Sequence, residues 1–261
     1  MIKKIIYITT ILFAAIIDSL QLSAQEGLVR YKYVLNVDST LYSRNTEGIP
    51  AFLYFNPVKS LFVFDRWKDT AYLSGTVNSV PLEDGAIVNY EERDEYGNMF
   101  YKDFASRSIS MRRLLFKEAF IARENLPAIN WIILKDTQTI GGYLCKKAVT
   151  HFRGRYYEAW FAPDIPVSDG PWKLCGLPGL ILEAYDKNKE IQYLFVSIQL
   201  PYPSLKYITA PRQGKYLSFE AFKNIERTQA DKMIKMVKAS MDRNDDVDIS
   251  VKIFPIEKNY E

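Results

Sequence analysis

The chain has 261 residues, of which 34 are Lys or Arg and 31 are Asp or Glu, and its formal net charge is +3. Binding to nucleic acid or to an anionic membrane surface needs a concentrated basic face, so this nearly balanced composition argues against both as partners. Aromatic side chains make up 14% of the residues, and tyrosine is the commonest of them. Tyrosine suits sheets that are packed on one face and wet on the other, so the composition favours a β-rich protein.

The first 24 residues have the three-part layout of a secretory signal peptide. Lys3 and Lys4 precede the apolar stretch Ile5–Ile17, and Leu22–Ala24 offers a small residue for cleavage before Gln25. The apolar stretch is shorter than the roughly 20 residues of a membrane-spanning helix. We therefore predict a signal peptide at residues 1–24 and an exported mature chain without a transmembrane segment, in the periplasm or at the outer-membrane periphery. The alternative is a short buried N-terminal helix.

Alternating or β-branched stretches between turn residues predict strands along most of the mature chain. They cover residues 29–37, 51–55, 60–64, 88–104, 112–122, 143–152, 155–161, 180–185 and 191–200. Asn56-Pro57 predicts a hairpin turn after the second of them, and Gly97-Asn98 predicts a turn between two paired strands within 88–104. The connections leave little room for crossover helices, so we expect antiparallel pairing.

One long helix is predicted near the end of the chain. Ser218 is its expected N-cap, and an apolar stripe runs from Phe222 to Ser240. The fold class that follows is mainly β (α+β): a curved antiparallel sheet or half-open barrel with this helix packed on it. No Gly/Ser-rich linker or internal repeat divides the chain, so residues 25–261 are expected to form a single domain.

The chain has two cysteines, Cys145 and Cys175. In an oxidising compartment a single pair indicates one disulfide, so we predict a bond between them. The alternative is two unrelated buried thiols.

Residues 140–186 contain an unusual density of Gly, Pro, Trp and charged residues. Within them stands the hexapeptide Gly-Leu-Pro-Gly-Leu-Ile at 176–181. Shared residues flank the hexapeptide at 142–143, 147–148, 152–155, 159–160, 164–166 and 170–171. The segment closely resembles the GLPGLI family of exported Bacteroidetes proteins. The resemblance implies export, an envelope setting and association with TonB-dependent outer-membrane receptors, and it supplies no catalytic residue.

The motif itself predicts a rigid connection. Pro178 fixes φ near −65° and Gly179 allows a positive φ, so residues 177–180 are expected to form a type II turn after Gly176. We interpret Gly176, Pro178 and Gly179 as structural turn residues. Trp172 and Leu177 are then either exposed docking groups for a ligand or partner, or plugs for the end of the sheet.

Arg153, Arg155 and Tyr157 are predicted to share one face of a strand. Two arginines beside a tyrosine suit a carboxylate or phosphate ligand. The alternative is a row of ion pairs with a neighbouring strand, for which Glu183 or Asp186 would serve. His151 is the single histidine, so cysteine–histidine catalysis and a zinc site both have little support. No metal site, catalytic residue or cofactor is therefore assigned.

The leading hypothesis is a non-enzymatic periplasmic or outer-membrane-associated binding or accessory protein. Its partner would be an outer-membrane receptor or another envelope protein, or its ligand a small apolar molecule, as in carriers of acyl chains. One alternative is an envelope hydrolase acting on peptides or glycans. Another is a structural component of an envelope assembly, which would show a broad apolar patch and no pocket.

Overall fold

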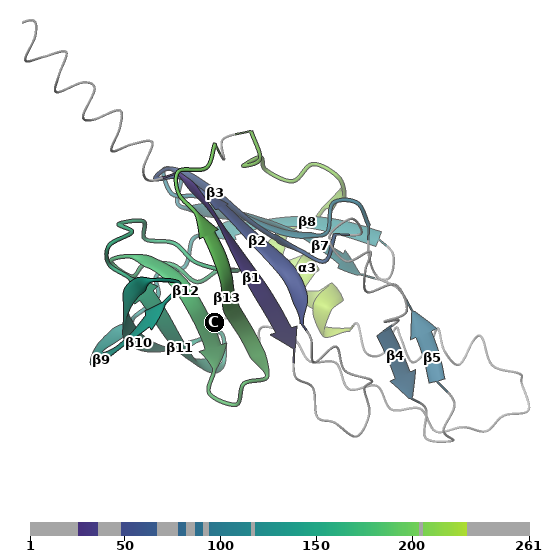
Figure 1. Ribbon diagram of the computed structural model, residues 1–261. Coiled ribbons are helices and arrows are strands. Elements are labelled where there is room, and N and C mark those ends of the chain that lie inside the picture. The colour runs from purple at the N-terminus through teal and green to yellow at the C-terminus, as the bar shows by residue number, and fades with distance from the viewer. Residues whose placement is uncertain are drawn as a thin grey trace, which may run out of the picture.

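The computed structural model describes residues 26–35, 48–66, 78–81, 87–90, 94–115, 118–203 and 206–228 (Figure 1). The predicted signal peptide lies outside these ranges. Across them, no helix is both long and apolar enough to cross a membrane. The strands are β1 (Gly27–Leu35), β2 (Ile49–Phe55), β3 (Lys59–Phe64), β4 (Asn78–Pro81), β5 (Ile87–Tyr90), β6 (Asn98–Asp103), β7 (Ser108–Leu115), β8 (Glu118–Asn125), β9 (Ile132–Ile140), β10 (Tyr143–Phe152), β11 (Arg155–Ala162), β12 (Leu180–Asp186), β13 (Ile191–Gln199) and β14 (Lys215–Tyr216).

Twelve of these strands form one curved sheet in the order β14-β8-β7-β6-β3-β2-β1-β13-β12-β11-β10-β9 (Figure 1). All its neighbours pair antiparallel except β14 and β8, which are parallel. The sheet is open, with β14 and β9 at its two edges, and β4 and β5 form a separate two-stranded sheet. The prediction of a mainly β protein is confirmed, and the sheet does not close into a barrel.

Most predicted hairpins are confirmed. β2 pairs with β3 around Asn56, whose side chain accepts hydrogen bonds from the backbone amides of Val58 and Lys59 at 2.9 Å each. β10 pairs with β11, and β12 pairs with β13. In each case a short turn joins two stretches of matching length, so local signals suffice to place them.

The predicted strand pair around Gly97-Asn98 is wrong. β6 starts at Asn98 but pairs with β3 and β7, whereas β5 pairs with β4. Gly97 instead lies against the preceding part of the sheet: a Cβ added there would stand 2.4 Å from the carbonyl oxygen of Phe64. The glycine therefore permits a close backbone approach rather than a hairpin turn.

The helix near the end of the chain is shorter than predicted. Helix α3 spans Phe219–Arg227, and Ser218 is its N-cap, accepting a hydrogen bond from the Ala221 amide at 3.2 Å. The rest of the expected stripe, from Met233 onward, lies outside the described residues. The described helix is thus a nine-residue element that buries one side chain, Phe222, and not a long cover for the sheet.

The inner face of the sheet is filled by the connection between β11 and β12. We call residues 163–179 the plug segment. Its residues Ile165, Val167, Trp172, Leu174 and Leu177 belong to the same buried cluster as the inward-facing residues of the strands. The outer face of β1, β2, β3 and β6 carries a smaller cluster that is covered by Ile208 and Tyr202.

Candidate ligand-binding groove

A fully buried ion pair anchors the plug segment to the sheet. Lys102 on β6 pairs with Asp169 of the plug, and both side chains are 0% exposed. The Lys102 ammonium also donates a hydrogen bond to the Gly170 carbonyl at 2.6 Å. Because a buried charge without its partner is costly, this pair fixes where the plug enters the inner face.

The predicted docking residues Trp172 and Leu177 are both buried, at 1% exposure each. The Trp172 ring packs 5.7 Å from that of Phe152 and 6.0 Å from that of Tyr157, measured between ring centroids. The interpretation of these two side chains as exposed docking groups is therefore wrong. They plug the sheet, as the alternative interpretation proposed.

The turn of the hexapeptide differs from the predicted type II turn. Gly179 has a positive φ of +152°, but its amide donates to the Leu177 carbonyl at 2.9 Å, and the Leu180 amide donates to the Ile165 carbonyl. This is a three-residue turn centred on Pro178, which fixes the φ that such a turn needs. A Cβ at Gly179 would stand 2.4 Å from the Ala162 carbonyl oxygen, so close backbone contact requires glycine.

Arg155 and Tyr157 share a face of β11 as predicted, and both are buried. The prediction that Arg153 shares this face is wrong, because Arg153 lies before the start of the strand, at a positive φ. Arg155 donates to Asp186 at 2.8 Å and to Glu190 at 2.5 Å. Burial lowers the pKa of Arg155, but its bond to Glu190 and nearby negative charge outweigh this, so the pKa lies above its ordinary value. Asp186, one of the two expected partners, is confirmed. The other, Glu183, instead accepts from the Phe195 amide.

Arg153 lies in the tight turn between β10 and β11. Arg153 and Gly154 have φ values of +52° and +75°, which are the left-handed values of a type I′ hairpin turn. A positive φ is unusual for arginine. Arg153 is held there by Glu124 on β8, whose carboxylate lies 2.8 Å from the guanidinium and also pairs with Lys173 of the plug. The turn, β8 and the plug are thereby joined by one carboxylate.

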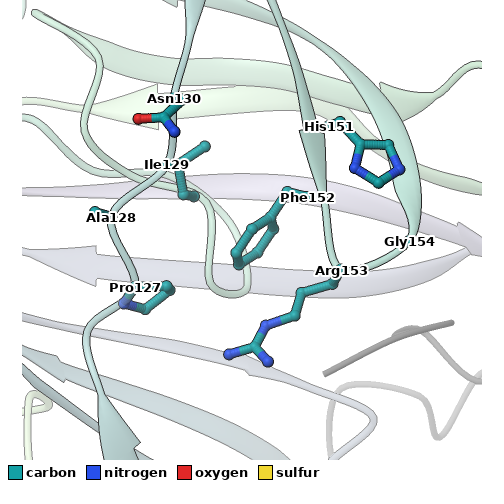
Figure 2. Close-up of a pocket in the computed structure, with 8 residues that line it drawn as sticks. All are labelled: Pro127, Ala128, Ile129, Asn130, His151, Phe152, Arg153 and Gly154. Atoms are coloured by element: carbon teal, nitrogen blue, oxygen red, sulfur yellow. The ribbon is translucent and has the colours of Figure 1, made fainter. Parts of the chain in front are cut away.

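Two adjoining hollows meet at Arg153. The first, of about 260 Å³, lies between residues 127–130 and residues 151–154 (Figure 2). The second, of about 610 Å³, lies at the ends of β7 and β8 beside Phe219. Both are lined by Arg153 and Pro127. We call them together the Arg153 groove.

The first hollow combines apolar walls with one guanidinium. Figure 2 shows the ring of Phe152 and the guanidinium of Arg153 projecting toward the segment that carries Pro127 and Ile129. The second hollow contains further hydrogen-bonding groups, and there Arg123 donates to the Ser108 hydroxyl at 2.8 Å. The groove can therefore take a ligand with an apolar part and hydrogen-bonding or acidic groups beside it.

Of the predicted binding residues, Arg153 alone lines a described pocket. Sequence reasoning missed Glu124, Lys173 and residues 127–130, because β8 and the plug are brought to the turn only by folding. Ile129 and Pro127 carry no motif that could have marked them. Among the described residues, no three His, Cys, Asp or Glu side chains are grouped closely enough to hold a metal ion.

The predicted disulfide between Cys145 and Cys175 is wrong, since both are free and buried. Cys145 lies on β10 near the charges of Glu183 and Asp164, whereas Cys175 lies in the plug near Lys102. The thiols thus occupy different surroundings in the core. Burial raises the pKa of each thiol to about 11.

A family described as "Protein of unknown function (Porph_ging)" matches residues 153–183. The matched segment runs from the Arg153 turn through the plug to β12, and it contains the hexapeptide. The match is consistent with the resemblance to GLPGLI-type proteins. No curated protein matches the sequence.

Two structures of PNGF-II, solved in different space groups, are similar to this fold. They have TM-scores of 0.54 and 0.52, are each 16% identical in sequence, and the matches cover 79% and 78% of this chain. This chain spans about a third of the PNGF-II chains, 34% and 33% of their lengths. At such low identity the similarity shows the fold alone.

Proposed function

We propose that the protein is an exported, non-enzymatic binding or accessory protein of the cell envelope that holds its ligand in the Arg153 groove. The observation that carries this is the geometry of Arg153, a buried cation in a left-handed backbone conformation at the shared wall of two hollows. Unusual backbone conformations persist where the surroundings hold them, and they concentrate at ligand sites. Glu124 supplies the restraint here.

Binding fits the groove better than hydrolysis does. Glycoside hydrolysis generally uses two carboxyl groups on either side of the scissile bond. Among the described residues that line the two hollows, Glu124 carries the one carboxylate, and it is engaged by Arg153 and Lys173. We therefore rank a binding role above the hydrolase alternative.

A surface ligand also fits better than a carried acyl chain. A carrier needs an apolar chamber, but the plug side chains Trp172, Leu174 and Leu177 occupy the inner face of the sheet. We place the ligand in the groove instead. An envelope receptor of the outer membrane remains the proposed partner for delivery or assembly.

A second candidate function, as a component of an envelope assembly, is favoured by the β9 edge. Ile132 and Ile133 on β9 are 65% and 47% exposed, and Leu144 on the neighbouring strand β10 is 55% exposed. Among the described strands β9 pairs only with β10, so its other edge has no described neighbour and can take another strand. Assembly through this edge would not use the groove.

A matched pair of variants separates the two functions. Ile129 lines the groove and Ile132 lies three residues away on the β9 edge, so Ile129→Ser and Ile132→Ser make the same chemical change at the two places. Immobilised wild type and variants would be exposed to envelope extracts, and the bound molecules identified by mass spectrometry.

We expect at least one species that binds wild type and Ile132→Ser but not Ile129→Ser. Circular dichroism and melting curves would verify that both variants are folded. If Ile129→Ser keeps every bound species, the groove is not the binding site. If Ile132→Ser alone loses them, the assembly function is the correct one.

A further inference from the structure

A third hollow lies on the outer face of the sheet. It lies where β1, β2 and β13 run side by side (Figure 1). Its volume is about 480 Å³, within the range of roughly 300–1,000 Å³ that is usual for small-molecule sites. We call it the β1–β13 trough. Its lining residues are Arg30, Tyr31, Lys32, Gly48, Ile49, Pro50, Ala51, Phe52 and Val196.

A β-bulge gives the trough its apolar wall. Arg30 is opposite Ser197 and Tyr31 is opposite Phe195, so Val196 is the extra residue of the pairing. Bulges re-aim side chains and occur next to functional sites. Val196 is 58% exposed and lies over a trough that also contains the half-buried Phe52.

The charge of the trough has one sign. Arg30 and Lys32 line it, and none of its lining residues is acidic. Arg30 donates to two neutral groups, Gln199 Oε1 at 3.2 Å and Ser197 Oγ at 3.5 Å. Within the described part of the chain, neither cation forms an ion pair with a carboxylate. A third cation, the guanidinium of Arg66, lies 5.1 Å from the centre of the Phe52 ring.

A peptide in the trough cannot pair with β1 as an added strand, because β1 is hydrogen-bonded to β2 on one side and to β13 on the other. An occupant must therefore bind through side chains. Apolar groups at the floor suit a ring or alkyl chain, and half-buried cations at the rim attract an acidic group more strongly than fully solvated ones do.

We propose that the β1–β13 trough binds a small amphiphilic anion, with an acidic group against Arg30 and Lys32 and an apolar ring or chain against Phe52 and Val196. The site is separate from the Arg153 groove, with which it shares no lining residue. The trough is therefore a ligand site in its own right, independent of whether the Arg153 groove binds a ligand.

Two fluorescent dyes test this proposal. Anilinonaphthalene sulfonate and phenylnaphthylamine have the same aromatic framework, but only the first is an anion. Each would be titrated into the folded wild-type protein, into an Arg30→Gln/Lys32→Gln double variant and into Val196→Asp. Lys146→Gln on β10 serves as the control, since Lys146 is exposed and lines none of the three hollows.

We expect a saturable component of anionic-dye binding, with one site per chain, that persists in Ile129→Ser and therefore lies outside the Arg153 groove. The double charge variant should weaken it by about tenfold or more, and Val196→Asp should abolish it, while Lys146→Gln should match wild type. Phenylnaphthylamine should bind wild type and the double charge variant equally. The proposal is overturned if the anionic dye does not saturate, if Val196→Asp retains it, or if the charge variant affects both dyes alike.

Discussion

Replacing Lys102 by methionine tests the anchor of the plug segment. The substitution keeps an unbranched side chain, shorter by the terminal ammonium, but leaves the Asp169 carboxylate buried at 0% exposure without its cation. Removing one partner of a buried pair costs about 3–5 kcal/mol in unfolding free energy. For a chain of this size that corresponds to a fall in Tm of about 6–20 °C.

The double variant Lys102→Met/Asp169→Leu separates two costs: the loss of the ion-pair attraction, and the burial of the Asp169 charge without a partner. It removes both charges and leaves only the Gly170 carbonyl without its donor, which costs about 1–3 kcal/mol. Urea denaturation of wild type, both single variants and the double variant would give the coupling energy. We expect the double variant to be more stable than Lys102→Met by about 2 kcal/mol. Equal stabilities of the two would refute a buried pair.

The remaining predictions concern the half-buried Glu183 and the two buried thiols. Burial raises the pKa of Glu183 above its ordinary value of 4.5. The protonated Glu183 side chain therefore contributes stability that is fully present below the unfolded pKa and is lost as pH rises through the folded pKa. Glu183→Gln should therefore be more stable than wild type at pH 7, by less than about 1 kcal/mol in unfolding free energy. This gain should vanish near pH 4. A loss of stability at pH 7 would contradict the reasoning. Because the pKa values of Cys145 and Cys175 are raised to about 11, neither thiol should react with a thiol reagent at pH 8 until the protein is denatured, when two should react. Rapid reaction of either in the native protein would show that it is not buried.

Local parts of this fold could be predicted from the sequence, because local signals determine them. The β10–β11 hairpin follows from two alternating stretches around Arg153-Gly154, and the start of α3 follows from the N-cap Ser218. The same face was correctly expected for Arg155 and Tyr157, since alternation along a strand needs no knowledge of its neighbours.

The position of the plug segment, on the surface or inside, could not be predicted in the same way. Its Gly and Pro residues indicate a rigid connection whether it lies on the surface or inside. What decides its position is Lys102, 68 residues before Gly170 in the sequence, and Glu124 on β8. For the same reason the Arg153 groove was missed, since its second wall, residues 127–130, meets the turn only after folding. The disulfide prediction was wrong because a count of cysteines says nothing about the distance between them in the fold.

Hydrogen–deuterium exchange followed by mass spectrometry tests most directly whether the plug segment fills the sheet. Its amides donate within the protein, as at Asp169, Leu174 and Gly176, where the N–H groups bond to the carbonyls of Val167, Pro171 and Ser168. Peptides covering residues 163–181 should exchange as slowly as those of β11 and β12. Complete exchange of these peptides within seconds, while β11 stays protected, would contradict the account.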